Sequence, residues 1–282
     1  MVGGKRANVA IWLVMFAATA CSQGTSDDVG AVSTAEYDSA DENSAVRYEN
    51  ETYEEAAQRH SAVHRGKHPE AFDSAVPSAQ GSQVPVDRAD LSRIPVWSDW
   101  EITQHFERTR DLRFLATADH PGFSRRLSWL YPDDGCYARA ELVSAKADEW
   151  LHKRPYRMFA FGNLMVTTSN YPTGKVTWWY HTVPVVKQAT TGEPVVFDAS
   201  LDPKKPIPWR QWLGLQVPNL NDVRVSICDG NTYGPEHPCF GAPAHTAEAL
   251  SDQRDRFLGR EWLRQVEMLR DPLRVLGDFP PW

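Results

Sequence analysis

Three residues of this chain, Cys136, His181 and Asp198, carry side chains that together can perform nucleophilic catalysis. A cysteine thiolate attacks a carbonyl carbon, a neighbouring histidine transfers the proton, and a carboxylate holds the histidine ring in the required tautomer. Each residue alone is more often structural: a buried cysteine, a core histidine, an aspartate in a turn. Their order along the chain and the elements predicted around them favour a catalytic triad.

The residues around Cys136 predict that its thiol lies at the start of a helix. Gly135 permits a tight turn, Asp133 or Asp134 is a candidate N-cap, and the segment 141–153 is rich in helix-forming residues. The positive end of a helix dipole stabilises a thiolate, and the unpaired backbone amides there can bind an oxyanion. This position therefore suits a nucleophile.

The other two residues lie on predicted strands. The segments 157–169, 175–187 and 194–201 are β-like and are separated by the turn-forming residues 170–174 and 191–192. His181 lies inside the second segment and Asp198 near the end of the third, so antiparallel pairing makes them neighbours. A helix at 100–114 and the helix after Cys136 complete an α+β domain, which we expect to begin near 91–97 and to cover residues 94–282.

Four sequence motifs in this order resemble those of bacterial protein glutaminases: Tyr131-Pro-Asp-Asp-Gly-Cys136-Tyr-Ala-Arg-Ala, Phe161-Gly-Asn-Leu164, Trp178-Trp-Tyr-His181 and Phe197-Asp-Ala-Ser-Leu201. The resemblance covers roughly residues 110–215. It implies an antiparallel sheet with a papain- or transglutaminase-like core, with Cys136 as nucleophile, His181 as base and Asp198 as the orienting carboxylate. Ala199 stands where the family usually has proline, a change that leaves the carboxylate in place.

The same resemblance implies that the protein hydrolyses the side-chain amide of protein-bound glutamine to glutamate and ammonia. It implies protein or peptide substrates, a monomer, and neither a cofactor nor a metal. The triad alone does not separate this activity from that of a transglutaminase or a cysteine protease, because all three use the same groups. A non-enzymatic surface lipoprotein with a structural triad is the remaining alternative.

Charge is distributed unevenly along the 282 residues, whose formal net charge is −7. Residues 22–60 contain ten acidic and two basic side chains, whereas ten of the 11 tryptophans lie at or beyond Trp97. The acidity therefore belongs to the front of the chain, and the aromatic-rich remainder is nearly neutral. This distribution argues against a nucleic-acid-binding protein, which would present a basic surface.

The first 21 residues have the pattern of an export signal. Lys5 and Arg6 precede the short apolar run 7–20, which ends in small residues before Cys21. This resembles a bacterial lipoprotein signal, in which the cysteine is diacylated and becomes the mature N-terminus. Ser22 then favours the outer membrane. An ordinary signal peptide cut nearby is the alternative, and both predict an exported protein.

Residues 22–93 have the composition of a disordered acidic tether or an inhibitory pro-segment, and the sequence does not separate the two. His60, His64 and His68 stand four apart, a spacing that can bind a metal on one face of a helix. Gly66 and Pro69 argue against a continuous helix there, so we expect a solvated tail and no metal site.

Cys228 and Cys239 bracket a short loop, and in an exported protein this spacing suggests a disulfide. A zinc site that uses both thiols with His237 is the less favoured alternative, because a fourth ligand is missing at the usual spacing. With Cys21 lipidated or removed, the disulfide leaves Cys136 as the free cysteine. The segment 247–269 is predicted to be an amphipathic helix that packs on the domain.

Overall fold

The structure, a computed structural model, describes residue 1, residues 41–69 and residues 75–282. Every element described below belongs to one compact unit within residues 34–282. The predicted signal segment, Cys21 and the acidic residues up to 40 lie outside the described residues. Within the described residues, no helix has the length and apolar character needed to cross a bilayer.

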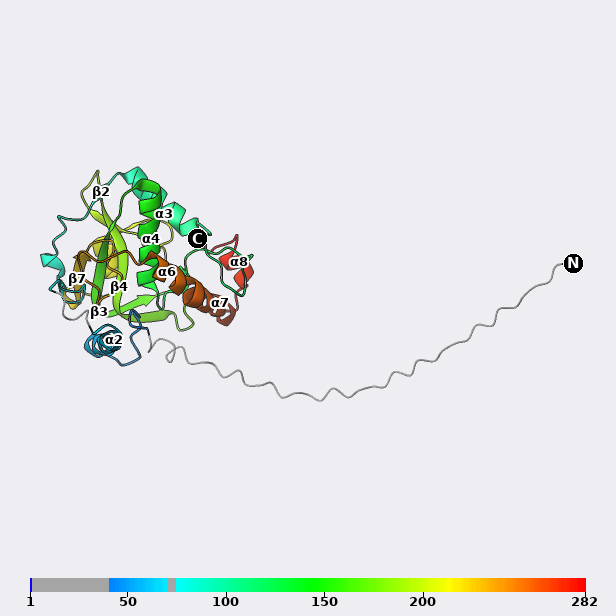
Figure 1. Cartoon of the computed structure of the whole chain (residues 1–282), viewed down its shortest axis with the longest axis horizontal. Helices are drawn as coiled ribbons and strands as arrows, with labels where there is room; N and C mark the ends of the chain where they lie inside the picture. Colours follow the sequence, from blue (N-terminus) through cyan, green and yellow to red (C-terminus); the bar gives the residue numbers. More distant parts are fainter. Residues whose placement is uncertain (2–40, 70–74) are drawn as a thin grey trace. The chain divides into compact units, whose positions relative to one another are not determined.

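A mixed sheet with mainly antiparallel pairing forms the centre of this unit (Figure 1). Its strands lie in the order β1, β7, β3, β4, β5, β6, and β2 pairs in parallel with the end of β4. The bounds of the strands are β1 Val84–Pro85, β2 Val96–Trp97, β3 Tyr156–Thr167, β4 Lys175–Gln188, β5 Pro194–Val196, β6 Ile207–Pro208 and β7 Val223–Cys228. The predicted strands at 157–169 and 175–187 are confirmed, whereas the third ends at Val196 and leaves residues 197–201 in a turn.

Helices cover the sheet, and the helix after Cys136 packs between β4 and α6 (Figure 1). The α-helices are α2 Tyr53–Lys67, α3 Asp99–Asp111, α4 Cys136–Leu151, α5 Trp209–Gly214, α6 Thr246–Asp252, α7 Leu258–Glu267 and α8 Pro272–Leu276. Short 3-10 turns occupy η2 Val86–Arg88 and η3 Leu220–Asp222, and η4 Gln253–Phe257 is a π-helical turn. The combination of helices with an antiparallel sheet confirms the predicted α+β class.

The helix predicted at 247–269 is present but interrupted. The π turn η4 inserts one extra residue between α6 and α7 and so rotates the following face. Phe257 and Leu258 are buried as expected, whereas Val266 and Leu269 are exposed. The expectation of one continuous buried stripe is therefore wrong beyond residue 258.

The described part of residues 22–93 is folded, so the prediction of a disordered tether is wrong for 41–69 and 75–93. α2 begins with a capping box formed by Thr52 and Glu55, and it continues through Gly66 to Lys67. Its buried face consists of small or polar residues, Ala56, Ala57, His60 and His64. Composition gave no sign of this packing because hydrogen bonds and small side chains, rather than large apolar ones, hold the segment.

β1 also places residues before 94 within the sheet, so the predicted domain boundary is too late. A contact between α2 and the sheet lies at the β-bulge of β3, at Gly162 and Asn163, where the register with β4 shifts. The Asn163 side chain accepts a hydrogen bond of 2.9 Å from the backbone amide of Tyr53 and so holds the first turn of α2 against the sheet. Residues 41–69 and 75–93 are thus an integral part of this unit.

Candidate active site

Cys136 is the first residue of α4, as its sequence context predicts. Gly135 precedes it with φ +77°, a left-handed conformation that favours glycine. A Cβ atom at this position would lie 2.8 Å from the ring of Phe257, so the turn also needs a residue without a side chain. The tight turn thereby places the Cys136 side chain at the amino end of a buried helix.

The aspartates before this turn do not cap α4, contrary to expectation, because Gly135 occupies the N-cap position. Asp133 instead forms a paired ion bridge with Arg264, at 2.7 Å for each oxygen. The turn is held from inside by buried Arg139, whose Nη1 donates to the carbonyl oxygens of Tyr131 and Asp134. These contacts fix the loop that carries the cysteine.

His181 and Asp198 meet as predicted. His181 Nε2 lies 2.7 Å from Asp198 Oδ2, and both side chains are buried. They meet because β4 and β5 pair antiparallel through the short loop, and the chain turns back directly after β5. The indole of Trp178 stacks on the His181 ring at a centroid distance of 4.6 Å and limits its rotation.

Two further groups hold the Asp198 carboxylate in place. Trp212, at the buried face of α5, donates from Nε1 to Oδ2 at 3.0 Å, and Ser200 donates from Oγ to Oδ1 at 2.8 Å. Nothing in the sequence spacing of Trp212 indicates a contact with Asp198. The Ser200 contact is local and follows from the Asp-x-Ser spacing in a turn.

The electrostatics of this pair favour an ionised carboxylate and a protonated imidazole. Burial on its own would lower the pKa of His181, but the charge and hydrogen bond of Asp198, together with the Cys136 side chain, raise it to about 9. Burial on its own would raise the pKa of Asp198, but His181, Trp212 and Ser200 lower it to about 2. Each group therefore stabilises the charged form of the other.

Cys136 lines the same small cavity as His181 and contributes to the raised pKa of its ring. The other ring nitrogen of His181, Nδ1, is buried and has no oxygen or nitrogen partner among the described residues, which leaves it for the thiol. Cys136 is 3% exposed, and the cavity that it shares with His181 and Asp198 has a volume of about 10 Å³. This space is about the size of one water molecule, so a substrate requires the site to open.

Residues 41–47, here called the strap, lie across the residues that surround Cys136. Ser44 Oγ donates to Asp134 Oδ2 at 2.7 Å, and the backbone amide of Ala45 donates to the other oxygen at 3.0 Å. The indole of Trp179 donates to the Ser44 carbonyl oxygen at 2.8 Å. The hydroxyl of Tyr180 donates to the carbonyl oxygen of Asn43.

A hydrogen bond and an ion pair at Asp41 hold the start of the strap. Asp41 Oδ2 accepts a hydrogen bond of 2.7 Å from the buried Tyr137 hydroxyl, and Arg256 lies 2.5 Å from the same oxygen. Val46 then forms a single antiparallel bridge with Trp178 of β4. Asp41 is thus tied to the residue after Cys136, and Val46 to the tryptophan that stacks on His181.

The remaining cysteines form the suggested bond. Cys228 and Cys239 are disulfide-linked, and Cys136 is the free cysteine among the described residues. Closing a loop with a separation of 11 residues stabilises the fold by about 3 kcal/mol in the chain-entropy account. The alternative zinc site with His237 is wrong, because both thiols are used in the disulfide.

Comparison with known proteins confirms the predicted resemblance: residues 102–216 match the family described as glutaminase. A comparison with curated proteins finds no match. Four solved chains do match. A crystal structure of protein-glutaminase shares 19% identity over 68% of this chain and 94% of that chain, with a TM-score of 0.39.

The NMR structure of protein-glutaminase from Chryseobacterium proteolyticum shares 19% identity over 66% of this chain and 92% of that chain, with a TM-score of 0.40. A mutant of pro-protein-glutaminase also shares 19% identity, over 57% of this chain and 56% of that chain, with a TM-score of 0.40. The match with this chain thus spans about half the length of the pro-form.

Proposed function

Because residues 102–216 match the glutaminase family, we propose that this protein deamidates glutamine side chains in proteins, with Cys136 as nucleophile, His181 as acid and base, and Asp198 as the orienting carboxylate. The observation that carries the proposal is the meeting of these three side chains in one buried cavity inside the matched segment. The 2.7 Å contact between His181 and Asp198 supports their roles.

The first half of the proposed reaction forms a thioester and releases ammonia. The Cys136 thiolate bonds to the side-chain amide carbon of glutamine, and the carbonyl oxygen takes the negative charge near the Cys136 backbone amide. His181, protonated at Nδ1, gives this proton to the amide nitrogen. The carbon–nitrogen bond then breaks, and ammonia leaves.

The second half returns the enzyme to its starting state. The now neutral His181 takes a proton from water, whose oxygen bonds to the thioester carbon. The carbon–sulfur bond breaks, the thiolate is restored and the product is glutamate. The net reaction consumes one water and releases one ammonia, and none of its steps requires a metal or cofactor.

We also propose that α4, β4 and the turn after β5 form a papain- or transglutaminase-like core. The support is the position of Cys136 at a helix N-terminus that packs against the strand carrying His181. The same helix brings an oxyanion-binding backbone amide to the nucleophile. In this arrangement the catalytic groups come from α4, β4 and the turn after β5, in this order along the chain.

The proposed activity is tested by incubating residues 41–282 or 75–282 with a glutamine-containing protein. We expect ammonia release together with a mass change from glutamine to glutamate. Isopeptide cross-links would instead identify a transglutaminase, and new chain termini without ammonia would identify a protease. Absence of all three products from folded residues 75–282, with a Cys136 that does not react with an alkylating reagent, would contradict the enzyme assignment.

We propose further that the strap and α2 act as an inhibitory segment rather than a tether. The support is that the strap binds Asp134, Trp179 and Tyr180 around a cysteine that is only 3% exposed. A chain that begins at residue 75 keeps β1 and its pairing with β7 but lacks these contacts. The sequence-based boundary at 94 would remove this strand.

Residues 75–282 are therefore expected to release ammonia faster than residues 41–282, by about 10² or more. The reason is that, with the strap present, several hydrogen bonds of about 1 kcal/mol each must break before the site opens. Initial rates at equal concentrations of folded chain measure this. Because removal of α2 uncovers Trp179, a second test uses Asp41→Asn with Ser44→Ala in residues 41–282. Unchanged rates in both, with a lower melting temperature for the double variant, would argue against inhibition by the strap.

Export remains a proposal that rests on residues 1–21, which lie outside the described residues. The disulfide between Cys228 and Cys239 supports an oxidising compartment. We propose that Cys21 is lipidated and anchors the protein at the bacterial membrane or cell surface. The mass of the N-terminal peptide of the mature protein distinguishes a diacylated Cys21 from an ordinary cleavage product.

A further inference from the structure

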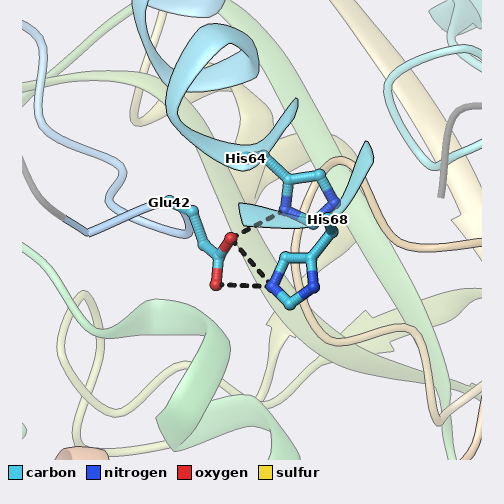
Figure 2. Close-up of side chains that lie close together, drawn as sticks. All are labelled: Glu42, His64 and His68. Carbon is cyan, nitrogen blue, oxygen red and sulfur yellow. Dashed lines mark hydrogen bonds and ion pairs between the residues drawn. The ribbon is translucent and has the colours of Figure 1, made fainter. Parts of the chain in front are cut away.

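A second cluster of reactive side chains lies away from the Cys136 cavity, where the strap meets the end of α2 (Figure 2). Glu42 Oε2 lies 3.1 Å from His64 Nδ1 and 3.2 Å from His68 Nε2. One ligand atom from each of the three residues lies within 4.8 Å of the others. Figure 2 shows both imidazole rings turned toward the carboxylate.

The spacing of His60, His64 and His68 would put them on one face of a continuous helix, but the structure separates His60 from the other two. The His60 ring stacks on Trp179 at a centroid distance of 5.5 Å, and its nitrogens lie near Arg59 and the strap carbonyl oxygens. His64 and His68 instead converge on Glu42. They do so because α2 continues through Gly66, which the sequence-based expectation of a tail did not allow.

Two imidazole nitrogens and one carboxylate oxygen form a ligand set that suits Zn²⁺ and related divalent transition metals. Ligands 2.0–2.1 Å from a tetrahedral zinc ion stand roughly 3.3 Å apart, close to the two separations measured from Glu42 Oε2. A small shift of the rings brings all three atoms to this spacing, and water can supply a fourth ligand. His64 is buried, whereas the His68 side chain is 45% exposed and gives an ion access from solvent.

The cluster combines one acidic side chain with two imidazole rings. Glu42 lies against both rings and is the acidic member of the set. The ring centroid of His237 lies 5.5 Å from that of His64, and His237 stands outside the three residues whose ligand atoms converge.

We propose that Glu42, His64 and His68 form a binding site for a single Zn²⁺ ion that joins the strap to the carboxyl end of α2. Glu42 lies within the strap, two residues before Ser44. His64 belongs to α2, which packs on β4, and His68 is the C-cap of that helix. A bound ion therefore links two parts of the N-terminal segment that are otherwise held by hydrogen bonds. The inference does not depend on the proposed activity.

Zinc titration of the full chain by calorimetry tests the site, with Cys21→Ser and Cys136→Ala introduced so that neither cysteine outside the disulfide competes for the metal. We expect one Zn²⁺ per chain, a higher melting temperature with zinc, and the visible absorption bands of a tetrahedral site with Co²⁺. In the same background, His68→Gln and Glu42→Gln are expected to weaken zinc binding by tenfold or more.

His120→Gln is the matched control, because it removes an exposed histidine that stacks on Trp262 and lies outside the cluster. It should leave the zinc affinity and the melting shift unchanged. Zinc binding that is equally strong in His68→Gln and Glu42→Gln would overturn the site, as would the absence of one-to-one binding in the parent chain. Circular dichroism of each variant establishes that a loss of binding is not a loss of fold.

Discussion

Replacing Cys136 with alanine is expected to lower kcat for ammonia release by about 10⁴–10⁶, because no other described residue offers a free thiol. Every other contact in the cavity remains, so binding of the substrate should change little. The measurement is ammonia release under single-turnover conditions, together with mass spectrometry for a thioester in the parent chain. Substantial activity in Cys136→Ala would contradict the assigned nucleophile.

Cys136→Ser is the matched control for shape, because it keeps a small polar side chain at the first residue of α4. It should be nearly as inactive as the alanine variant, since a serine hydroxyl is a far weaker nucleophile than a thiolate at neutral pH. Alkylation gives an independent readout. Because Cys136 is 3% exposed, iodoacetamide should react slowly with residues 41–282 and faster with residues 75–282.

The sequence predicted the parts of the site that depend on contacts near in sequence. Cys136 begins α4 because Gly135 and the helix-forming residues after it act locally. His181 and Asp198 are 17 residues apart and are joined by one hairpin, so alternation and turn residues were enough to bring them together. The four motifs added the chemical roles that the residue types alone left open.

The parts that were missed depend on contacts between residues far apart in the chain. Ser44 and Asp134 are 90 residues apart, and the sequence around an aspartate before a helix equally predicts an N-cap. Trp212 reaches Asp198 only because α5 folds back over the turn after β5. Glu42 likewise meets His64 because the strap and α2 pack on the same region of β4, which no short pattern reveals.

The same distinction explains why composition was misleading at the front of the chain. A segment with few large apolar residues was expected to stay solvated because burial would not offset its conformational entropy. Here the entropy is offset by buried polar contacts, such as the Asp41 bridge with Arg256 and the bonds of Asp134 to the strap. Such contacts require partners from the folded domain, so they are invisible in the segment itself.

Replacing Asp198 with asparagine is expected to lower kcat by about 10³–10⁴ and to change its pH dependence. In the parent chain Asp198 Oδ2 accepts from both His181 and Trp212. Asparagine keeps one acceptor oxygen and loses the negative charge. If that oxygen faces His181 and Trp212, the amide nitrogen stands where Oδ1 accepted from the Ser200 amide and hydroxyl; in the opposite orientation the nitrogen faces the two donors. In both orientations the protonated His181 loses its counter-charge. Ser200→Ala, which removes only a neutral donor to the same carboxyl group, should cost much less.

The sign of the pH effect follows from the direction of the pKa change. Asp198, together with Cys136, raises the pKa of His181 from 6.5 to about 9. In the parent chain His181 therefore stays protonated, and able to protonate the leaving amide nitrogen, until the pH approaches 9. In Asp198→Asn the alkaline fall of kcat/KM should move to lower pH, whereas in Ser200→Ala it should stay near its parent position. Equal alkaline limbs in the parent and Asp198→Asn would show that the carboxylate does not control the histidine.

The free energy of unfolding should depend on pH through the pKa shifts of the same two groups. A raised pKa in the folded state stabilises the fold fully below pH 6.5, and this contribution is lost as the pH rises toward 9. The lowered pKa of Asp198 stabilises the fold above its ordinary value of 3.8 and is lost as the pH falls toward 2. Urea unfolding between pH 6 and 9.5 should therefore show a decline in the parent chain that Asp198→Asn lacks. This second readout separates an electrostatic role of Asp198 from a purely structural one, which would lower stability equally at every pH.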